Sequence, residues 1–157
     1  MTVTFRNVDA SPADDVRTWP YEAIVIVLER GLVADWQPLI DEVRVRPHGE
    51  VARALESYVS YAEPSGITRL CELVIASART DLDARDRREV ADRVQRAIAL
   101  SGVSAREFAA TLGTSASRLS TYANGKVVPS AALLMRMERE AARADDHSLP
   151  RGRHRTP

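Results

Sequence analysis

The stretch Ser104–Lys126, SAREFAATLGTSASRLSTYANGK, decides the fold of the C-terminal half of the chain. It contains two short runs with helical spacing, which a Gly-Thr pair separates and an Asn-Gly pair closes. Ser104 and Glu107 have the spacing of a capping box, which marks the start of a helix. Gly113 permits a sharp turn, and Ser115 is suited to cap the second run. The spacing therefore predicts two helices joined by a short turn.

The second run divides into an apolar face and a face of small polar side chains. Leu119 and Tyr122 form the face that we expect to pack on a core. The small Ala109 in the first run allows close approach, and two helices joined by so short a turn cross steeply, as in a helix-turn-helix. In such a unit the second helix enters the major groove, so short side chains suit contact with base edges and phosphates. The residues on that second face are Ala116, Ser117, Arg118, Ser120 and Thr121.

Residues 87–143 resemble the Cro-like, or XRE, family of phage-repressor helix-turn-helix domains. The resemblance is carried by REFAATLGTSASRLSTYANGKVVPS, residues 106–130. Its features are the alanine inside the first motif helix, the glycine in the turn, the aliphatic Leu119, the Asn-Gly-Lys ending and the Pro-Ser before the next helix. The resemblance implies a five-helix fold and binding of double-stranded DNA.

The resemblance also implies roles for individual residues by position. Family members often carry glutamine where this chain has Ala105 and Ala116, so bidentate readout of bases is weak here and DNA shape is expected to supply part of the specificity. Arg118 either clamps a phosphate or reads a guanine. The base-facing residues are Ala116, Ser117 and Thr121. The phosphate-facing residues are Ser104, Ala105, Ser115, Arg118, Ser120, Asn124 and Lys126.

The flanking segments complete a predicted DNA-binding domain over residues 81–144. Residues 79–102 are charged up to Glu89 and apolar afterwards, which predicts a connector that becomes the first helix of this domain. Ser130 is suited to cap a last helix, with Leu133, Leu134 and Met137 toward the core. Residues 145–157 predict a disordered basic tail. Its arginines either contact phosphates or stay solvated; they are Arg151, Arg153 and Arg155.

Residues 1–80 predict a helical module of four to five short helices. Residues 20–31 favour a buried helix, although their β-branched residues also suit a strand. Ser11 and Asp35 are placed as N-caps of two helices, and further helices are expected over 50–63 and 67–78. Residues 2–8 suit a short edge strand or an extended arm. The whole chain is thus predicted to be all-α, with this module preceding the Cro-like domain.

The net charge of zero hides an asymmetry between the two halves. Residues 1–80 hold 8 Arg and 12 Asp or Glu, for a net charge of −4. Residues 81–157 hold 14 Lys or Arg and 10 Asp or Glu, for a net charge of +4. The basic half is the half with the helix-turn-helix pattern, as expected for a nucleic-acid-binding module joined to a different one.

Other functional classes find little support in the sequence. The three histidines lie beside turns or in the tail, and neither a metal-ligand spacing nor a phosphate loop is present, so we expect no enzyme, metal site or cofactor. The single Cys71 lies on an apolar helical face and is expected to be a buried thiol. The N-terminus lacks the pattern of a signal peptide and the longest apolar run is Ala23–Leu28, so we expect a cytoplasmic protein without a membrane span.

Together these patterns predict a DNA-binding transcriptional regulator, most simply a homodimeric repressor that binds paired half-sites. In this interpretation residues 1–80 serve dimerisation. The alternative is an antitoxin, in which residues 1–80 bind and neutralise a toxin while the C-terminal domain represses its own operon.

Overall fold

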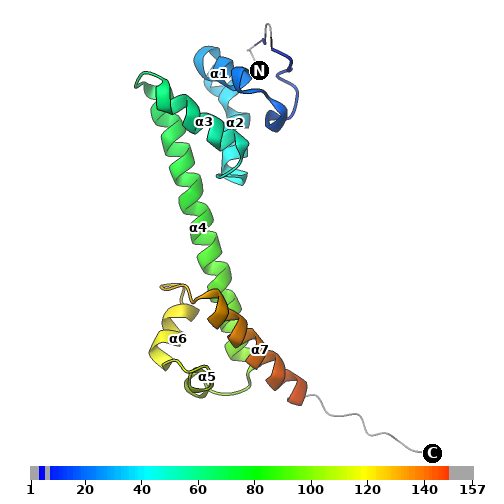
Figure 1. Ribbon diagram of the computed structural model, residues 1–157, viewed down its shortest axis with the longest axis vertical. Helices are drawn as coiled ribbons and strands as arrows, with labels where there is room; N and C mark the ends of the chain where they lie inside the picture. Colours follow the sequence, from blue (N-terminus) through cyan, green and yellow to red (C-terminus); the bar gives the residue numbers. More distant parts are fainter. Residues whose placement is uncertain (1–3, 6–7, 149–157) are drawn as a thin grey trace, which may run out of the picture. The chain divides into compact units, whose positions relative to one another are not determined.

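The structure, a computed structural model, describes residues 4–5 and 8–148 (Figure 1). In this part of the chain all regular structure is helical, which confirms the predicted all-α class. The chain divides into two compact units, with the boundary between Asp83 and Ala84. The strand or arm expected over residues 2–8 lies largely outside the described residues. None of the helices described is long and apolar enough to cross a membrane.

The described part of the first unit contains four complete helical segments and the beginning of a fifth: η1 (Val16–Thr18), α1 (Tyr21–Arg30), α2 (Val33–Val45), α3 (Glu50–Tyr61) and the start of α4 (Gly66–Leu100). The β-branched run in α1 is helical, because its buried residues recur at helical spacing. These residues join a core with the inner faces of the other helices. The core consists of Trp19, Ala23, Ile24, Val27, Leu28, Leu39, Val43, Val51, Ala52, Leu55, Tyr58, Cys71, Ile75 and Ala78.

The helix start predicted at Ser11 is wrong. The Asp14 carboxylate accepts a hydrogen bond from the Ser11 backbone N–H at 2.7 Å, and the Ser11 hydroxyl accepts one from the Ala13 N–H at 3.3 Å. Such local side-chain bonds offer the backbone an alternative to a helix. The residue that acts as an N-cap is Asp15, and it begins only the short η1.

Asp35 lies in the first turn of α2, and not at the N-cap position predicted from the sequence. Its carboxylate is buried and accepts a hydrogen bond from the Leu32 backbone N–H at 3.0 Å. The helix therefore begins at Val33. The neighbouring Trp36 donates its indole N–H to the Val27 carbonyl at 2.9 Å, which ties α2 to α1.

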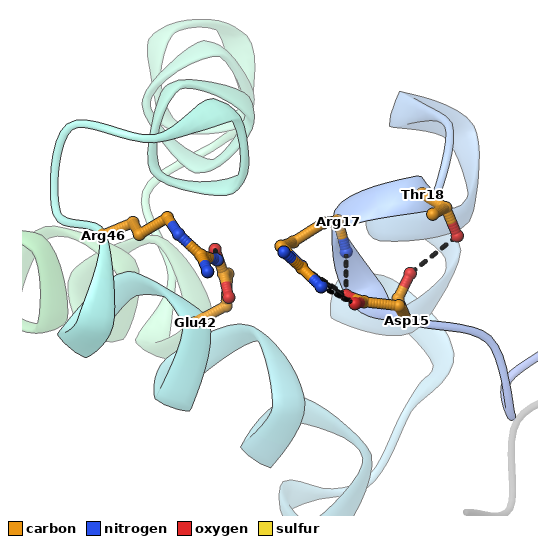
Figure 2. Close-up of polar contacts among 5 residues, drawn as sticks. All are labelled: Asp15, Arg17, Thr18, Glu42 and Arg46. Carbon is orange, nitrogen blue, oxygen red and sulfur yellow. Dashed lines mark hydrogen bonds and ion pairs between the residues drawn. The ribbon is translucent and has the colours of Figure 1, made fainter.

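Two ion pairs face each other where η1 packs against α2 (Figure 2). Asp15 pairs with Arg17, and Glu42 in α2 pairs with Arg46, the residue that caps the C-terminal end of α2. The side-chain and backbone hydrogen bonds from Arg17 lower the pKa of Asp15 from 3.8 to about 2. Because Asp15 and Arg17 are exposed, their pair adds little to stability.

Residues 67–78 and 79–100 form one continuous helix, α4, and not the helix and separate connector predicted from the sequence. No Gly or Pro occurs between residues 67 and 100, so nothing in the sequence ends the helix at the charged stretch. The boundary between the two units falls within α4.

The described part of the second unit consists of the end of α4, α5 (Ala105–Thr111), α6 (Ala116–Ala123) and α7 (Ala131–Ser148). Residues 84–148 thus hold four helical segments, where the family resemblance implies five. No Gly or Pro interrupts residues 131–148, so a single helix fills this stretch. The core consists of Val94, Ala97, Phe108, Ala109, Leu112, Leu119, Tyr122, Leu134, Met137 and Ala141.

The end of α7 corrects the predicted start of the tail. Residues 145–148 belong to the helix and not to a disordered segment. The remainder of the predicted tail, residues 149–157 with its three arginines, lies outside the described residues.

Candidate nucleic-acid interface

The capping box that starts α5 is confirmed. The Ser104 hydroxyl accepts a hydrogen bond from the Glu107 backbone N–H at 3.3 Å. In return, the Glu107 carboxylate accepts from the Ser104 N–H at 2.9 Å and from the Ser104 hydroxyl at 2.7 Å. The hydrogen bonds from the Ser104 hydroxyl and backbone lower the pKa of Glu107. A charged carboxylate therefore occupies the start of α5.

The turn between α5 and α6 has the geometry that its sequence predicts. Gly113 has a φ of 69°, in the left-handed region that glycine adopts without strain. The Gly113 N–H donates a hydrogen bond to the Ala110 carbonyl at 3.1 Å, and the Thr114 N–H donates one to the Ala109 carbonyl at 3.0 Å. These hydrogen bonds cap the C-terminal end of α5. The Ser115 hydroxyl then caps α6 by accepting from the Arg118 N–H at 3.1 Å. This turn joins α5 to α6, and the two helices pack directly against each other (Figure 1).

Replacing Gly113 with alanine is expected to lower the free energy of unfolding by about 1 kcal/mol. An added Cβ would meet no atom within 4 Å, so the cost comes from the backbone conformation alone. Urea denaturation followed by circular dichroism measures it. The matched control is Gly66→Ala at the start of α4, where a Cβ is equally free and φ is not positive, and it should cost nothing. Equal effects of the two substitutions would contradict the assigned turn.

The two faces of α6 are separated as predicted. Leu119 and Tyr122 are buried against the core. The predicted base-facing residues lie on the outer side: Ala116 and Ser117 are exposed and Thr121 is half-buried. The Thr121 hydroxyl donates to the Arg118 carbonyl at 2.7 Å, so in this rotamer its oxygen can only accept from a ligand.

Most of the predicted phosphate-facing residues lie on α6 or directly beside its ends. Their side chains are exposed, and the Asn124 amide donates to the Ser120 hydroxyl at 3.3 Å. In the described part of the chain, neither Arg118 nor Lys126 forms an ion pair. The predicted phosphate-facing residues on α6 or beside its ends are Ser115, Arg118, Ser120, Asn124 and Lys126.

The other two predicted phosphate contacts, Ser104 and Ala105, lie at the start of α5. Both are exposed, but the Glu107 carboxylate already accepts the hydrogen bonds that Ser104 offers. A phosphate at this position would meet a like charge and compete for the same donors. This physical conflict makes Ser104 and Ala105 weaker candidates than the residues on α6.

Two contacts that fix the ends of α5 and α6 in the unit were not foreseen from the sequence. The Gln95 amide on α4 donates to the Ala123 carbonyl at the end of α6, at 2.7 Å. Arg136 on α7 donates to the Leu112 carbonyl at the end of α5, at 3.4 Å. Both join segments that are distant in sequence, so local patterns carry no signal for them.

The described residues hold neither a metal-binding cluster nor a reactive thiol. In that part of the chain, no group of three or more His, Cys, Asp and Glu side chains could hold a metal ion. Burial raises the pKa of Cys71 to about 11, so its thiol stays protonated and unreactive at neutral pH. Comparison with models of known families, with curated proteins and with solved structures gives no match for this chain.

Proposed function

We propose that this protein is a sequence-specific DNA-binding transcriptional regulator, and that α6 is the helix that enters the major groove. The observation that carries the proposal is the outer face of α6. It combines short, exposed side chains with Arg118, and Lys126 follows three residues after the helix. Neither cation forms an ion pair with a carboxylate of the described residues. A helix of this kind can approach base edges closely while its ends meet the phosphate backbone.

The charge of Arg118 is available to a phosphate. Arg93 on α4 is paired with Glu138 on α7 at 2.6 Å, so its charge is used inside the unit. Arg118 has no such partner in residues 84–148. Binding a phosphate through Arg118 therefore breaks no ion pair of these residues, and it releases counterions from the DNA.

The regulator acts as a homodimeric repressor in this proposal. A single α6 covers only a few base pairs, and two copies related by two-fold symmetry read half-sites about one turn of DNA apart. Light scattering at micromolar concentration measures the mass of the free protein, and a monomer both free and on DNA would contradict the dimer.

Replacing Arg118 with alanine is expected to weaken DNA binding and to reveal what Arg118 contacts. A phosphate contact predicts uniform weakening on all sequences and a salt slope, d log K/d log[salt], that is smaller in magnitude by about 1. A guanine contact predicts that preference is relaxed at one base pair, at a cost of about 1–3 kcal/mol. Fluorescence anisotropy over a salt series separates the two.

The matched control for Arg118 is Arg139→Ala on α7, which also removes one exposed arginine that pairs with no carboxylate of the described residues. It should bind DNA nearly as the wild-type protein does. Wild-type affinity, slope and base preference in the Arg118→Ala variant would refute α6 as the recognition helix.

A second candidate function is an antitoxin whose first unit binds a protein partner. The observation that favours it is that the first unit has its own core and yet exposes several large apolar side chains. Co-expression with the product of the neighbouring gene tests it: a stable heteromeric complex supports the antitoxin, and a homodimer alone supports plain repression. The exposed large apolar residues of the first unit are Leu32, Val33, Val45, Tyr61 and Leu73.

A further inference from the structure

A cleft of about 460 Å³ lies in the second unit, between α4 and the C-terminal end of α6. Arg87, Arg88 and Gln95 line it from α4, while Asn124 and Gly125 line it from the end of α6. The predicted site residues include Asn124 but none of the α4 side chains. The cleft therefore adds side chains of α4 to the candidate site at the end of α6.

The sequence of α4 builds this cleft with a stripe of residues spaced three and four apart, at positions 84, 87, 88, 91 and 95. Small residues at its floor allow close approach: a Cβ added to Gly125 would lie 3.6 Å from the Ala91 Cβ. The Gln95–Ala123 hydrogen bond holds the end of α6 in place at one edge. Packing and this hydrogen bond thus fix the walls of the cleft.

The charges in the cleft favour an anion. Arg87 and Arg88 are both exposed, and within the described residues neither forms a hydrogen bond or an ion pair through its side chain. One carboxylate, Asp92, also lines the cleft. Lys126 follows the cleft residue Gly125 in the sequence but does not line the cleft. Two guanidinium forks and an amide suit the oxygen atoms of a phosphodiester.

We propose that this cleft binds a phosphodiester group of the DNA backbone, through Arg87 and Arg88 on α4 together with Asn124. This inference rests on the proposed function and goes further, because it names a phosphate contact on α4. Since Gln95 and Gly125 fix α4 against the end of α6, a phosphate held here sets how deeply α6 lies in the groove.

The test compares the double variant R87A/R88A with the wild-type protein on a random-sequence DNA duplex, by fluorescence anisotropy over a salt series. Non-specific binding depends on phosphate contacts, so no operator is needed. The expected result is weaker binding and a salt slope smaller in magnitude by about 1 for each phosphate that the variant no longer binds. R87K/R88K keeps both charges and should keep most of the slope.

The matched control is R96A/R139A, which removes two other exposed arginines of the same unit that pair with no carboxylate of the described residues. It changes the net charge by the same amount as R87A/R88A and leaves the cleft intact. It should therefore change the slope less. Equal changes of slope in the two double variants would overturn the cleft as the place where the phosphate binds.

If Arg87 and Arg88 only stabilise the fold, the double variant R87A/R88A gives a different result. Cations near the C-terminal end of α6 also complement its helix dipole. In that case R87A/R88A would lower the melting temperature and leave the salt slope unchanged, which would overturn the inference while the proposed function stands. If the wild-type protein shows no salt-dependent binding at all, the proposed function fails, and the inference fails with it.

Discussion

Replacing Ser117 with glutamate is expected to reduce DNA binding by about 100-fold or more. Ser117 is exposed near the start of α6, on the face assigned to the major groove. A carboxylate there would face the negative potential of the groove, and like charges placed together at an interface cost several kcal/mol. A negative charge near a helix N-terminus is itself favourable for folding, so the weaker binding would not come from unfolding of α6. Fluorescence anisotropy with a duplex measures the change in affinity.

The matched control for Ser117 is Ser77→Glu, which places the same charge at an exposed serine on α4 in the first unit. It should bind DNA with an affinity close to that of the wild-type protein. Equal affinities of the Ser117→Glu variant and the wild-type protein would show that this face of α6 does not meet DNA.

Replacing Leu119 with alanine is expected to lower the free energy of unfolding by about 2–5 kcal/mol. Leu119 is 0% exposed and lies in the core of the second unit, where alanine would leave a cavity. Both tryptophans, Trp19 and Trp36, belong to the first unit, so tryptophan fluorescence is a poor reporter of this change. Urea denaturation followed by far-UV circular dichroism detects it.

The control for Leu119 is Leu100→Ala at the end of α4, because Leu100 is 53% exposed. Its cost should stay below about 1 kcal/mol, since the substitution removes little buried surface. If both substitutions cost the same, Leu119 does not occupy the core position described above.

Local signals in the sequence predicted the helices around the candidate site. The Ser104–Glu107 capping box, the left-handed Gly113 and the Ser115 cap each depend on residues within a few positions of one another. The buried positions of Leu119 and Tyr122 followed from helical spacing. Such features depend on short stretches of sequence, so a single chain is enough to predict them.

Helix lengths and contacts between distant segments were harder to predict. The charged middle of α4 suggested a break, but charge does not end a helix when no Gly or Pro is present. α7 is likewise longer than expected, and Ser11 begins a turn in place of a helix. The cleft beside Arg87 depends on how α4 packs against the end of α6, which no local pattern specifies. The base-facing and phosphate-facing roles on α6 stay predictions.

The most direct test of DNA recognition by α6 is footprinting of the purified protein on the DNA upstream of its own gene, at two salt concentrations. A dimeric regulator predicts two protected patches on one face of the duplex, about one turn apart. Protection should weaken at the higher salt concentration, because phosphate contacts release counterions. Absence of protection at the lower salt concentration would contradict the assignment of α6 as a DNA-reading helix.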